Sequence, residues 1–234
     1  MTETLTIDIE QTIRDDMQIA QYRVVSRFCS RRNQVYRIQA RLSDSSSLDF
    51  VYKVYVSGDI EKEYDFLNRL KGHNVPAVLA KGKKALCLSY VGGQLLIEKL
   101  EETERDDEPF TPFLDKLIDF LARFYEALPG FVYGDINLRN FIIAHEDLYG
   151  IDLEQAREGS IASDIGRTAA YLLMYDPACT PYKKSITDYF IDTGVKRFSI
   201  SKEDVLNCMN RELDTMQARR CLRETKISQG LLCR

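Results

Sequence analysis

Apolar and polar residues alternate along several stretches in the first third of the chain, a pattern typical of half-buried strands. In residues 35–42, one face would carry Tyr36, Ile38, Ala40 and Leu42, and the other Arg37, Gln39 and Arg41. A polar turn at 44–47 follows, and 48–56 resumes the alternation with Val51, Lys53 and Tyr55 on one face. Residues 85–91 predict a further strand, which ends at a Gly-Gly pair.

Helical spacing of apolar side chains appears next. A helix is predicted from about residue 60 to 71, where Gly72 stops it. Its apolar stripe is Ile60, Tyr64, Leu67 and Leu70. A longer helix is predicted from Thr111 to the Pro-Gly pair at 129–130. Its apolar positions are Phe113, Leu117, Leu121, Phe124 and Leu128.

Two later segments also have helical spacing. Residues 163–175 predict a buried helix, and a capping-box-like start at 201–204 opens another. The inner face of the latter would be Val205, Cys208, Met209, Leu213 and Met216. The order of elements predicts an α+β fold with a β-rich lobe at 1–91 and a helical lobe at 92–234. The acidic run at 101–108 is a candidate flexible connection, although a solvated loop or helix face is the favoured interpretation.

Composition and charge exclude several classes of protein. The chain has 234 residues, 44% of them hydrophobic, which is enough for one sizeable core or two small lobes. The net charge is −4 with no basic cluster, so we expect no nucleic-acid partner. The six cysteines include no Cys-x-x-Cys pair, which disfavours a zinc site. With no apolar signal core and no stretch near the roughly 18–20 residues of a membrane span, we expect a cytoplasmic protein. As a separate expectation, we take it to be a monomer.

The strongest chemical signal lies in residues 133–154. Asn140 follows Asp135 by five positions, and Asp152 stands at the end of the second strand of an expected β-hairpin. Two carboxylates and a carboxamide can hold Mg²⁺, which prefers oxygen ligands, and can orient a hydroxyl group. Asp and Asn in a turn are ordinary, but this set around a hairpin favours a phosphoryl-transfer site of the protein-kinase type.

This stretch resembles the protein-kinase-like superfamily, most of all its aminoglycoside phosphotransferase and choline kinase branch. In that branch the catalytic loop reads roughly His-Gly-Asp-x-x-x-x-Asn, and the metal site reads Ile-Asp-x-Glu. Here residues 133–140 are Tyr-Gly-Asp-Ile-Asn-Leu-Arg-Asn, and residues 151–154 are Ile-Asp-Leu-Glu. The resemblance extends in order over about residues 20–175. It implies a bilobal protein-kinase-like fold, in which a small antiparallel sheet with one helix precedes a mainly helical lobe.

The resemblance also implies ATP and Mg²⁺ as cofactors and assigns roles to particular residues. Asn140 and Asp152 would hold the metal, and Asp135 would position the acceptor hydroxyl as the third catalytic residue. Lys53 would bind the phosphates and pair with Glu63 of the following helix. Glu61 is the rival partner for Lys53, but it points to a different side of that helix.

Further positions would support the nucleotide and the loop. Asp164 would brace the catalytic loop, the alternative being a helix N-cap. Residues Leu88, Ser89, Tyr90 and Val91 would meet the adenine, and Ser30 and Arg31 lie in the turn that would cover the phosphates. For Glu154, a role beside the metal and a surface position are equally open.

Three positions depart from the pattern. Tyr133 replaces the usual loop histidine, and Asn137 stands where Lys, His or Ser often assists the γ-phosphate. The turn at 28–33 has no glycine, so side chains would have to replace the backbone amides that approach phosphates in Gly-rich loops. These side chains are Ser30, Arg31 and Arg32.

Three functions remain open from the sequence. The leading hypothesis is an ATP- and Mg²⁺-dependent phosphotransferase that acts on a hydroxyl of a small molecule. Only eleven residues lie between Asp152 and Asp164, which leaves no room for a long peptide-docking segment. A compact atypical Ser/Thr protein kinase is the alternative, because such kinases also lack that segment. A catalytically silent kinase fold that binds nucleotide or a partner is the third possibility.

Overall fold

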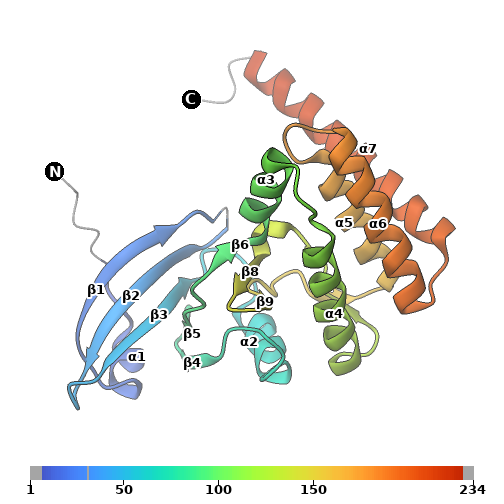
Figure 1. The fold of residues 1–234 in the computed structure, drawn as a ribbon. Coiled ribbons are helices and arrows are strands. Elements are labelled where there is room, and N and C mark those ends of the chain that lie inside the picture. Colours follow the sequence, from blue (N-terminus) through green and yellow to red (C-terminus); the bar gives the residue numbers. More distant parts are fainter. Residues whose placement is uncertain (1–6, 31, 229–234) are drawn as a thin grey trace. The chain divides into compact units, whose positions relative to one another are not determined.

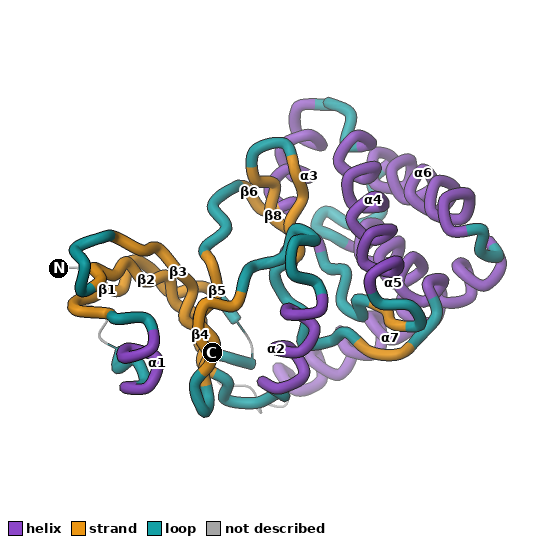
Figure 2. The backbone as a smooth tube through the Cα atoms, turned by 90° about the horizontal axis from the view of Figure 1, so that it is seen from below, coloured by secondary structure: helices purple, strands orange, loops and turns teal. Residues whose placement is uncertain are grey.

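The computed structural model describes residues 7–30 and 32–228, which form two compact units. The sheet unit comprises the chain up to Leu95 together with Phe141–Ala156. The helical unit comprises Leu96–Asn140 and the chain from Arg157 onward. Figure 2 shows strands gathered in the first unit and most helices in the second, which confirms the α+β class. The predicted lobes, 1–91 and 92–234, were each one continuous stretch of chain, whereas the sheet unit also includes Phe141–Ala156. The division into a nucleotide-binding lobe and a catalytic lobe stays a prediction.

A five-stranded antiparallel sheet forms the body of the sheet unit (Figure 1). In chain order its strands are β1 (Ile19–Phe28), β2 (Gln34–Leu42), β3 (Ser47–Val54), β4 (Val78–Lys81) and β5 (Ala85–Ser89), arranged as β1-β2-β3-β5-β4. The sequence predicted β2 and β3 from their alternation and β5 from the segment at 85–91. It did not reveal β1, because two register irregularities along β1 interrupt its period of two.

The two faces of this sheet have different partners. On one face, the central even-numbered side chains of β2 and β3, such as Ile38 and Phe50, are buried in an apolar cluster with Ile9 and Ile13 of the N-terminal segment. That segment contains α1 (Gln11–Asp16). Burying a side chain such as Ile13 contributes roughly 2 kcal/mol. Odd-numbered positions project to the opposite face, and Lys53 is among them.

Helix α2 (Ile60–Arg69) follows β3. Asp59 caps it by accepting hydrogen bonds from the backbone N–H groups of Glu61 and Lys62. The predicted inner residues Leu67 and Leu70 are buried, whereas Ile60 and Tyr64 are only half-buried. Glu63 is fully buried on the inner face, which places a carboxylate in the interior of the sheet unit.

A second, three-stranded sheet carries the expected hairpin. Strand β6 (Gln94–Leu95) pairs with β8 (Phe141–Ala144), and β8 pairs with β9 (Asp147–Gly150). The Ile-Asp-Leu-Glu sequence at 151–154 follows β9 directly. The hairpin therefore delivers Asp152 and Glu154 to the sheet unit, far along the sequence from β3.

In the part of the chain that the structure describes, the helical unit contains five α-helices. They are α3 (Leu96–Asp106), α4 (Thr111–Ala127), α5 (Ile161–Met174), α6 (Pro181–Phe198) and α7 (Lys202–Ser228). The predictions at 111–128, 163–175 and from 201 are confirmed. Most of the acidic run at 101–108 lies in α3, with Glu101 exposed, which confirms the favoured helix face.

Close packing fixes α5 against α7. A Cβ atom at Gly166 would lie 2.5 Å from the carbonyl oxygen of Val205, so the two helices approach at a position that only glycine permits. Among the described residues, none of the helices combines the length and the hydropathy that a membrane crossing demands.

Candidate functional site

Lys53 lies at the centre of a cluster of carboxylates in the sheet unit. Its Nζ atom is 2.7 Å from Glu63, 2.8 Å from Glu154 and 3.4 Å from Asp152. Only 7% of the Lys53 side chain is exposed. The strand alternation of β3 turns Lys53 away from the apolar cluster, and α2 and the segment after β9 supply its partners. Three elements that are distant in sequence thus converge on one ammonium group.

Glu63 is held in place by further contacts. The hydroxyl of Tyr55 donates a hydrogen bond to the same Glu63 oxygen that meets Lys53. The backbone N–H of Leu153 also points at Glu63, at 3.5 Å. Glu61, the rival partner, forms an exposed ion pair with Lys81 instead. The buried helix face therefore selects Glu63 as the partner of Lys53.

The electrostatics keep Lys53 charged. Burial disfavours the ammonium form, but the nearby carboxylates of Glu63, Asp152 and Glu154 outweigh that effect and raise the pKa of Lys53. Burial also raises the pKa of Glu63, and the charge of Asp152 adds to this, while Lys53 opposes it. A lysine of this kind is a fixed positive charge suited to binding phosphate oxygens.

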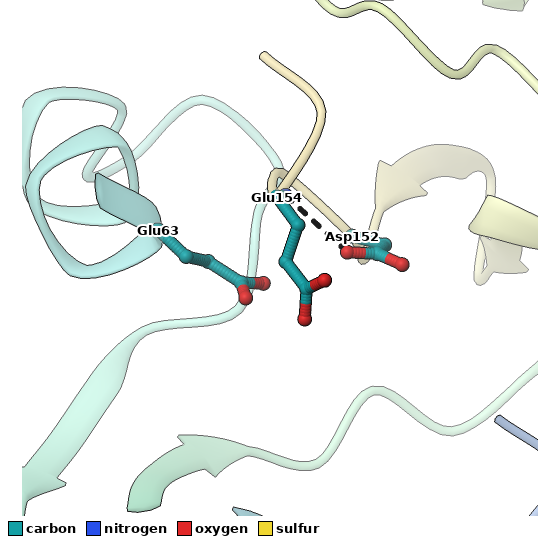
Figure 3. A group of neighbouring side chains, drawn as sticks. All are labelled: Glu63, Asp152 and Glu154. Atoms are coloured by element: carbon teal, nitrogen blue, oxygen red, sulfur yellow. Dashed lines mark hydrogen bonds between the residues drawn. The ribbon is translucent and has the colours of Figure 1, made fainter. Parts of the chain in front are cut away.

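Three carboxylates around Lys53 are candidate metal ligands (Figure 3). One oxygen from each of Glu63, Asp152 and Glu154 lies within 4.8 Å of the others. Asp152 has the most exposed side chain of the three, at 40%, and has the longest contact with Lys53. An all-oxygen donor set suits Mg²⁺, which usually takes one or two protein carboxylates. The residues present therefore fit the ion that the sequence implied, with Asp152 as the available ligand.

The predicted catalytic loop lies in the helical unit and is internally hydrogen-bonded. The carboxamide nitrogen of Asn140, in the short helix η1 (Leu138–Asn140), donates to the backbone oxygen of Asp135 at 2.9 Å. This bond fixes how the Asn140 carboxamide is oriented. The Asn137 side-chain oxygen accepts hydrogen bonds from the N–H of Arg139 and the hydroxyl of Tyr175, each at 3.0 Å. The structure thus uses that oxygen to shape the loop.

Asp164 contacts the start of this loop. Its carboxylate accepts hydrogen bonds from the backbone N–H groups of Tyr133 (2.7 Å) and Gly134 (3.0 Å) and from the Tyr125 hydroxyl (3.1 Å). The N-cap of α5 is Ser160, so Asp164 lies inside the helix and does not cap it. Burial raises the pKa of Asp164 to about 6, although these hydrogen bonds favour the charged form.

Tyr133, which stands where the family pattern has histidine, is fully buried. Its ring packs edge-on against Phe120, at 6.0 Å between centroids, and at a tilt against Phe124, at 5.5 Å. Only the backbone N–H of Tyr133 is used in the hydrogen bond to Asp164. The substitution therefore leaves the brace between Asp164 and the loop intact.

The residues predicted to meet the adenine lie at the end of β5 and directly after it. Leu88 is buried next to Val51 of β3, and the Ser89 hydroxyl accepts the backbone N–H of Ala77 at 2.9 Å. The ring of Tyr90 is stacked by the Arg37 guanidinium, 3.9 Å from the ring centroid. Val91 follows in a loop and is half-buried.

The predicted phosphate-covering turn is only partly described. The Ser30 hydroxyl accepts a hydrogen bond from the backbone N–H of Asn33 at 3.3 Å. Arg31, the other phosphate-contacting residue predicted there, lies outside the described residues. Ser30 is therefore used to shape the turn.

Several residues with clear contacts gave weak signals in the sequence. Tyr175 donates to Asn137 and accepts the N–H of Leu138 at 2.8 Å, but a lone tyrosine after a helix attracts no attention. Arg167 donates to the carbonyl of Gly134 and pairs with Glu212 of α7 at 3.2 Å. Its spacing of three residues from Asp164 is the one signal that could have linked it to the loop.

The two units and the buried Lys53–Glu63 pair define a kinase-like protein of mixed α+β fold. The chain matches the family model of the RIO domain over residues 9–166, which is more than half of its length, and it belongs to the RIO domain family. RIO domains are atypical, kinase-like domains that bind ATP. None of the curated proteins matches the chain.

The family match refines the expectations from the sequence. It confirms the protein-kinase-like superfamily and the bilobal kinase-like fold. It does not confirm the nearer placement with aminoglycoside phosphotransferases and choline kinases. It fits the alternative of an atypical protein kinase better than that of a small-molecule kinase. The match ends at Gly166, so α6 and α7 lie beyond it.

Proposed function

We propose that the protein is an ATP- and Mg²⁺-dependent phosphotransferase of the atypical kinase type. The observation that carries this proposal is the buried ammonium of Lys53, 2.7 Å from Glu63 and beside Asp152. A charged lysine held by a buried glutamate next to a metal-binding aspartate is the arrangement that kinases use on nucleotide phosphates. Membership of the RIO domain family supports the same activity.

In this proposal each residue has one task. Lys53 binds the α- and β-phosphates, and Glu63 holds Lys53 in position. Asp152 and Asn140 supply oxygen ligands for the metal, which when bound neutralises charge on the phosphates. Asp135 accepts a hydrogen bond from the acceptor hydroxyl and takes its proton late in the transfer.

Asp164 acts through the backbone of the loop. By accepting the N–H groups of Tyr133 and Gly134, it positions the residue that follows them, Asp135. Phosphoryl transfer depends mainly on such positioning, because little covalent work is left to the protein. Asp164 is therefore a positioning residue, and Asp135 the residue that meets the substrate.

The acceptor that the family favours is a serine or threonine hydroxyl of a protein. A hydroxyl of a small molecule is the second candidate. The observation in its favour is the short segment from Asp152 to Asp164, which is taken up by a two-residue strand, β10 (Arg157–Glu158), and the start of α5. A segment of this length offers little surface on which a peptide could dock.

Thermal melting of the full chain with ATP or GTP, with and without Mg²⁺, tests the nucleotide site. A ligand that binds only the folded state raises the melting temperature by mass action. We expect a Mg²⁺-dependent rise for the wild type and a much smaller one for Asp152→Asn. Asp119→Asn, which removes an exposed carboxylate from α4, is the matched control and should behave as the wild type. The absence of any shift at millimolar nucleotide would contradict the proposal and leave a kinase fold that serves as a scaffold.

A further inference from the structure

Glu154 is the point at which four segments of the sheet unit meet. Its carboxylate oxygen Oε1 accepts a hydrogen bond from the side-chain N–H of Asn33, and the same oxygen lies 2.8 Å from Lys53 Nζ. Its backbone oxygen accepts a hydrogen bond from Lys62 Nζ of α2 at 3.2 Å. Gly58, in the loop between β3 and α2, has its Cα so close that an added Cβ would lie 3.5 Å from the other carboxylate oxygen. Only 7% of the Glu154 side chain is exposed.

Asn33 is fixed at its other atoms as well. Its side-chain oxygen accepts the backbone N–H of Val56 at 3.3 Å, and its own backbone N–H donates to the Ser30 hydroxyl at 3.3 Å. Asn33 is 6% exposed and ends the turn between β1 and β2. It therefore joins that turn to the loop after β3 and to Glu154, which is 121 residues further along the chain.

The turn needs such an attachment because it contains no glycine. In a Gly-rich loop, the backbone itself approaches the phosphates and its amides make the contacts. Side chains make such a close approach harder, so we expect the place of this turn to depend more on side-chain bonds. A hydrogen bond from an amide to a buried carboxylate is charge-assisted and is stronger than a neutral one.

We propose that Glu154 is a positioning residue that holds the phosphate-covering turn, through Asn33, in register with Lys53 and Asp152. This inference rests on the proposed nucleotide site. One carboxylate oxygen bonds to both Asn33 and Lys53, so the turn and the lysine are set relative to each other. The backbone N–H of Glu154 also donates to the Asp152 carboxylate at 3.3 Å, the bond drawn in Figure 3. Glu154 thereby connects all three parts of the triphosphate site.

The experiment is a double-mutant cycle on nucleotide affinity, measured by calorimetry on the full chain with Mg²⁺. We expect Asn33→Ala and Glu154→Ala each to weaken ATP binding about tenfold, and the double variant to be no weaker than either single one. Adenosine, which lacks phosphates, should bind all variants equally. Melting temperatures measured without nucleotide check that each variant folds. If Glu154→Ala does not fold, the affinities of Asn33→Ala for ATP and for adenosine still test the inference.

If Glu154 acted only through its charge, Glu154→Ala would strengthen ATP binding instead of weakening it, so the two explanations predict opposite changes in affinity. Removing a negative charge beside Lys53 should favour a triphosphate if no positioning were lost. Glu154→Gln keeps an acceptor oxygen for Asn33 and removes the charge, so we expect ATP affinity at or above that of the wild type. Glu61→Ala, which removes an exposed carboxylate of α2 from outside the cluster, is the matched control and should change nothing.

Three outcomes would overturn the inference while the proposed function stands. They are unchanged ATP affinity in both alanine variants, an equal loss for adenosine, and a hundredfold, additive loss in the double variant. Tighter ATP binding by Glu154→Ala would also overturn it, because charge would then be the main effect. If the wild type binds no ATP at all, the proposed function fails first, and the inference fails with it.

Discussion

Because Asp164 is buried, we expect its carboxyl to contribute stability that is lost as pH rises from about 4 to 6. Burial raises the pKa of this group from its ordinary value of 3.8 to about 6 in the folded state. Near pH 4 and below, the carboxyl is protonated in the folded state. Between the two pKa values, the folded protein keeps the proton that the unfolded chain loses, so the free energy of unfolding decreases with pH. Above about pH 6, the contribution stays constant.

The size of this effect follows from the shift itself. A difference of about 2 pKa units between the folded and unfolded states corresponds to about 3 kcal/mol. The charged form would be penalised more without the N–H groups of Tyr133 and Gly134, the Tyr125 hydroxyl and the nearby Arg167, all of which lower the pKa. The pKa of Asp164 is still raised because the effect of burial is larger than the combined effect of these partners.

Urea unfolding of the wild type and of Asp164→Asn, at a series of pH values from 4 to 7.5, isolates the group. The difference in unfolding free energy between the two proteins should favour the wild type by about 2 kcal/mol more at pH 4 than at pH 7, because at pH 4 the unfolded carboxyl has already lost more than half of its proton. Asp119→Asn controls for the general effect of removing a carboxyl from the helical unit. A difference between wild type and Asp164→Asn that is the same at every pH would refute the reasoning.

Three further perturbations test other contacts. Lys53→Met leaves three carboxylates clustered without their cation, so urea unfolding should show an unfolding free energy that is about 3–5 kcal/mol lower. ATP binding should become undetectable in the same preparation. Gly166→Ala places a Cβ atom against the backbone of α7, and we expect a lower melting temperature and about 1–3 kcal/mol less stability. Gly194→Ala is the control, because the nearest neighbour of a Cβ atom there is a side-chain methyl at 3.2 Å, and its stability should stay within about 1 kcal/mol of the wild type. Tyr175→Phe removes the acceptor of the Leu138 N–H, and a loss of about 1–2 kcal/mol in urea unfolding is expected; no loss would show that the loop does not depend on that hydroxyl.

The elements with a regular period were predictable, and those without one were not. Strand β2 and helix α4 have long, uninterrupted patterns, and their observed bounds lie close to those predicted. Helix α6 was missed because its buried face includes Lys183 and Thr187, which look like surface residues in a sequence. Lys183 is buried because it pairs with Glu104 of α3, a partner that periodicity cannot reveal.

Some residues of the candidate site could likewise be predicted from the sequence, and others could not. Lys53, Glu63 and Asp152 could be recognised because phosphoryl transfer needs these residue types and because their order along the chain resembles that of the kinase-like superfamily. The role of Glu154 was left open, since its contact with Asn33 joins positions 121 residues apart. Such a bond depends on how the hairpin of β8 and β9 returns to the sheet unit, which is a tertiary feature.

The most direct test of the central claim is transfer of labelled phosphate from [γ-³²P]ATP. The wild type, incubated with Mg²⁺ and a cell extract that supplies protein and small-molecule hydroxyls, should place label on an acceptor or on itself. Asp135→Asn, which keeps the shape of the side chain but cannot take the proton, should lose nearly all of this transfer while it still binds ATP. Equal labelling by the wild type and Asp135→Asn, or ATP binding without any transfer by the wild type, would contradict the assignment of this protein as a phosphotransferase.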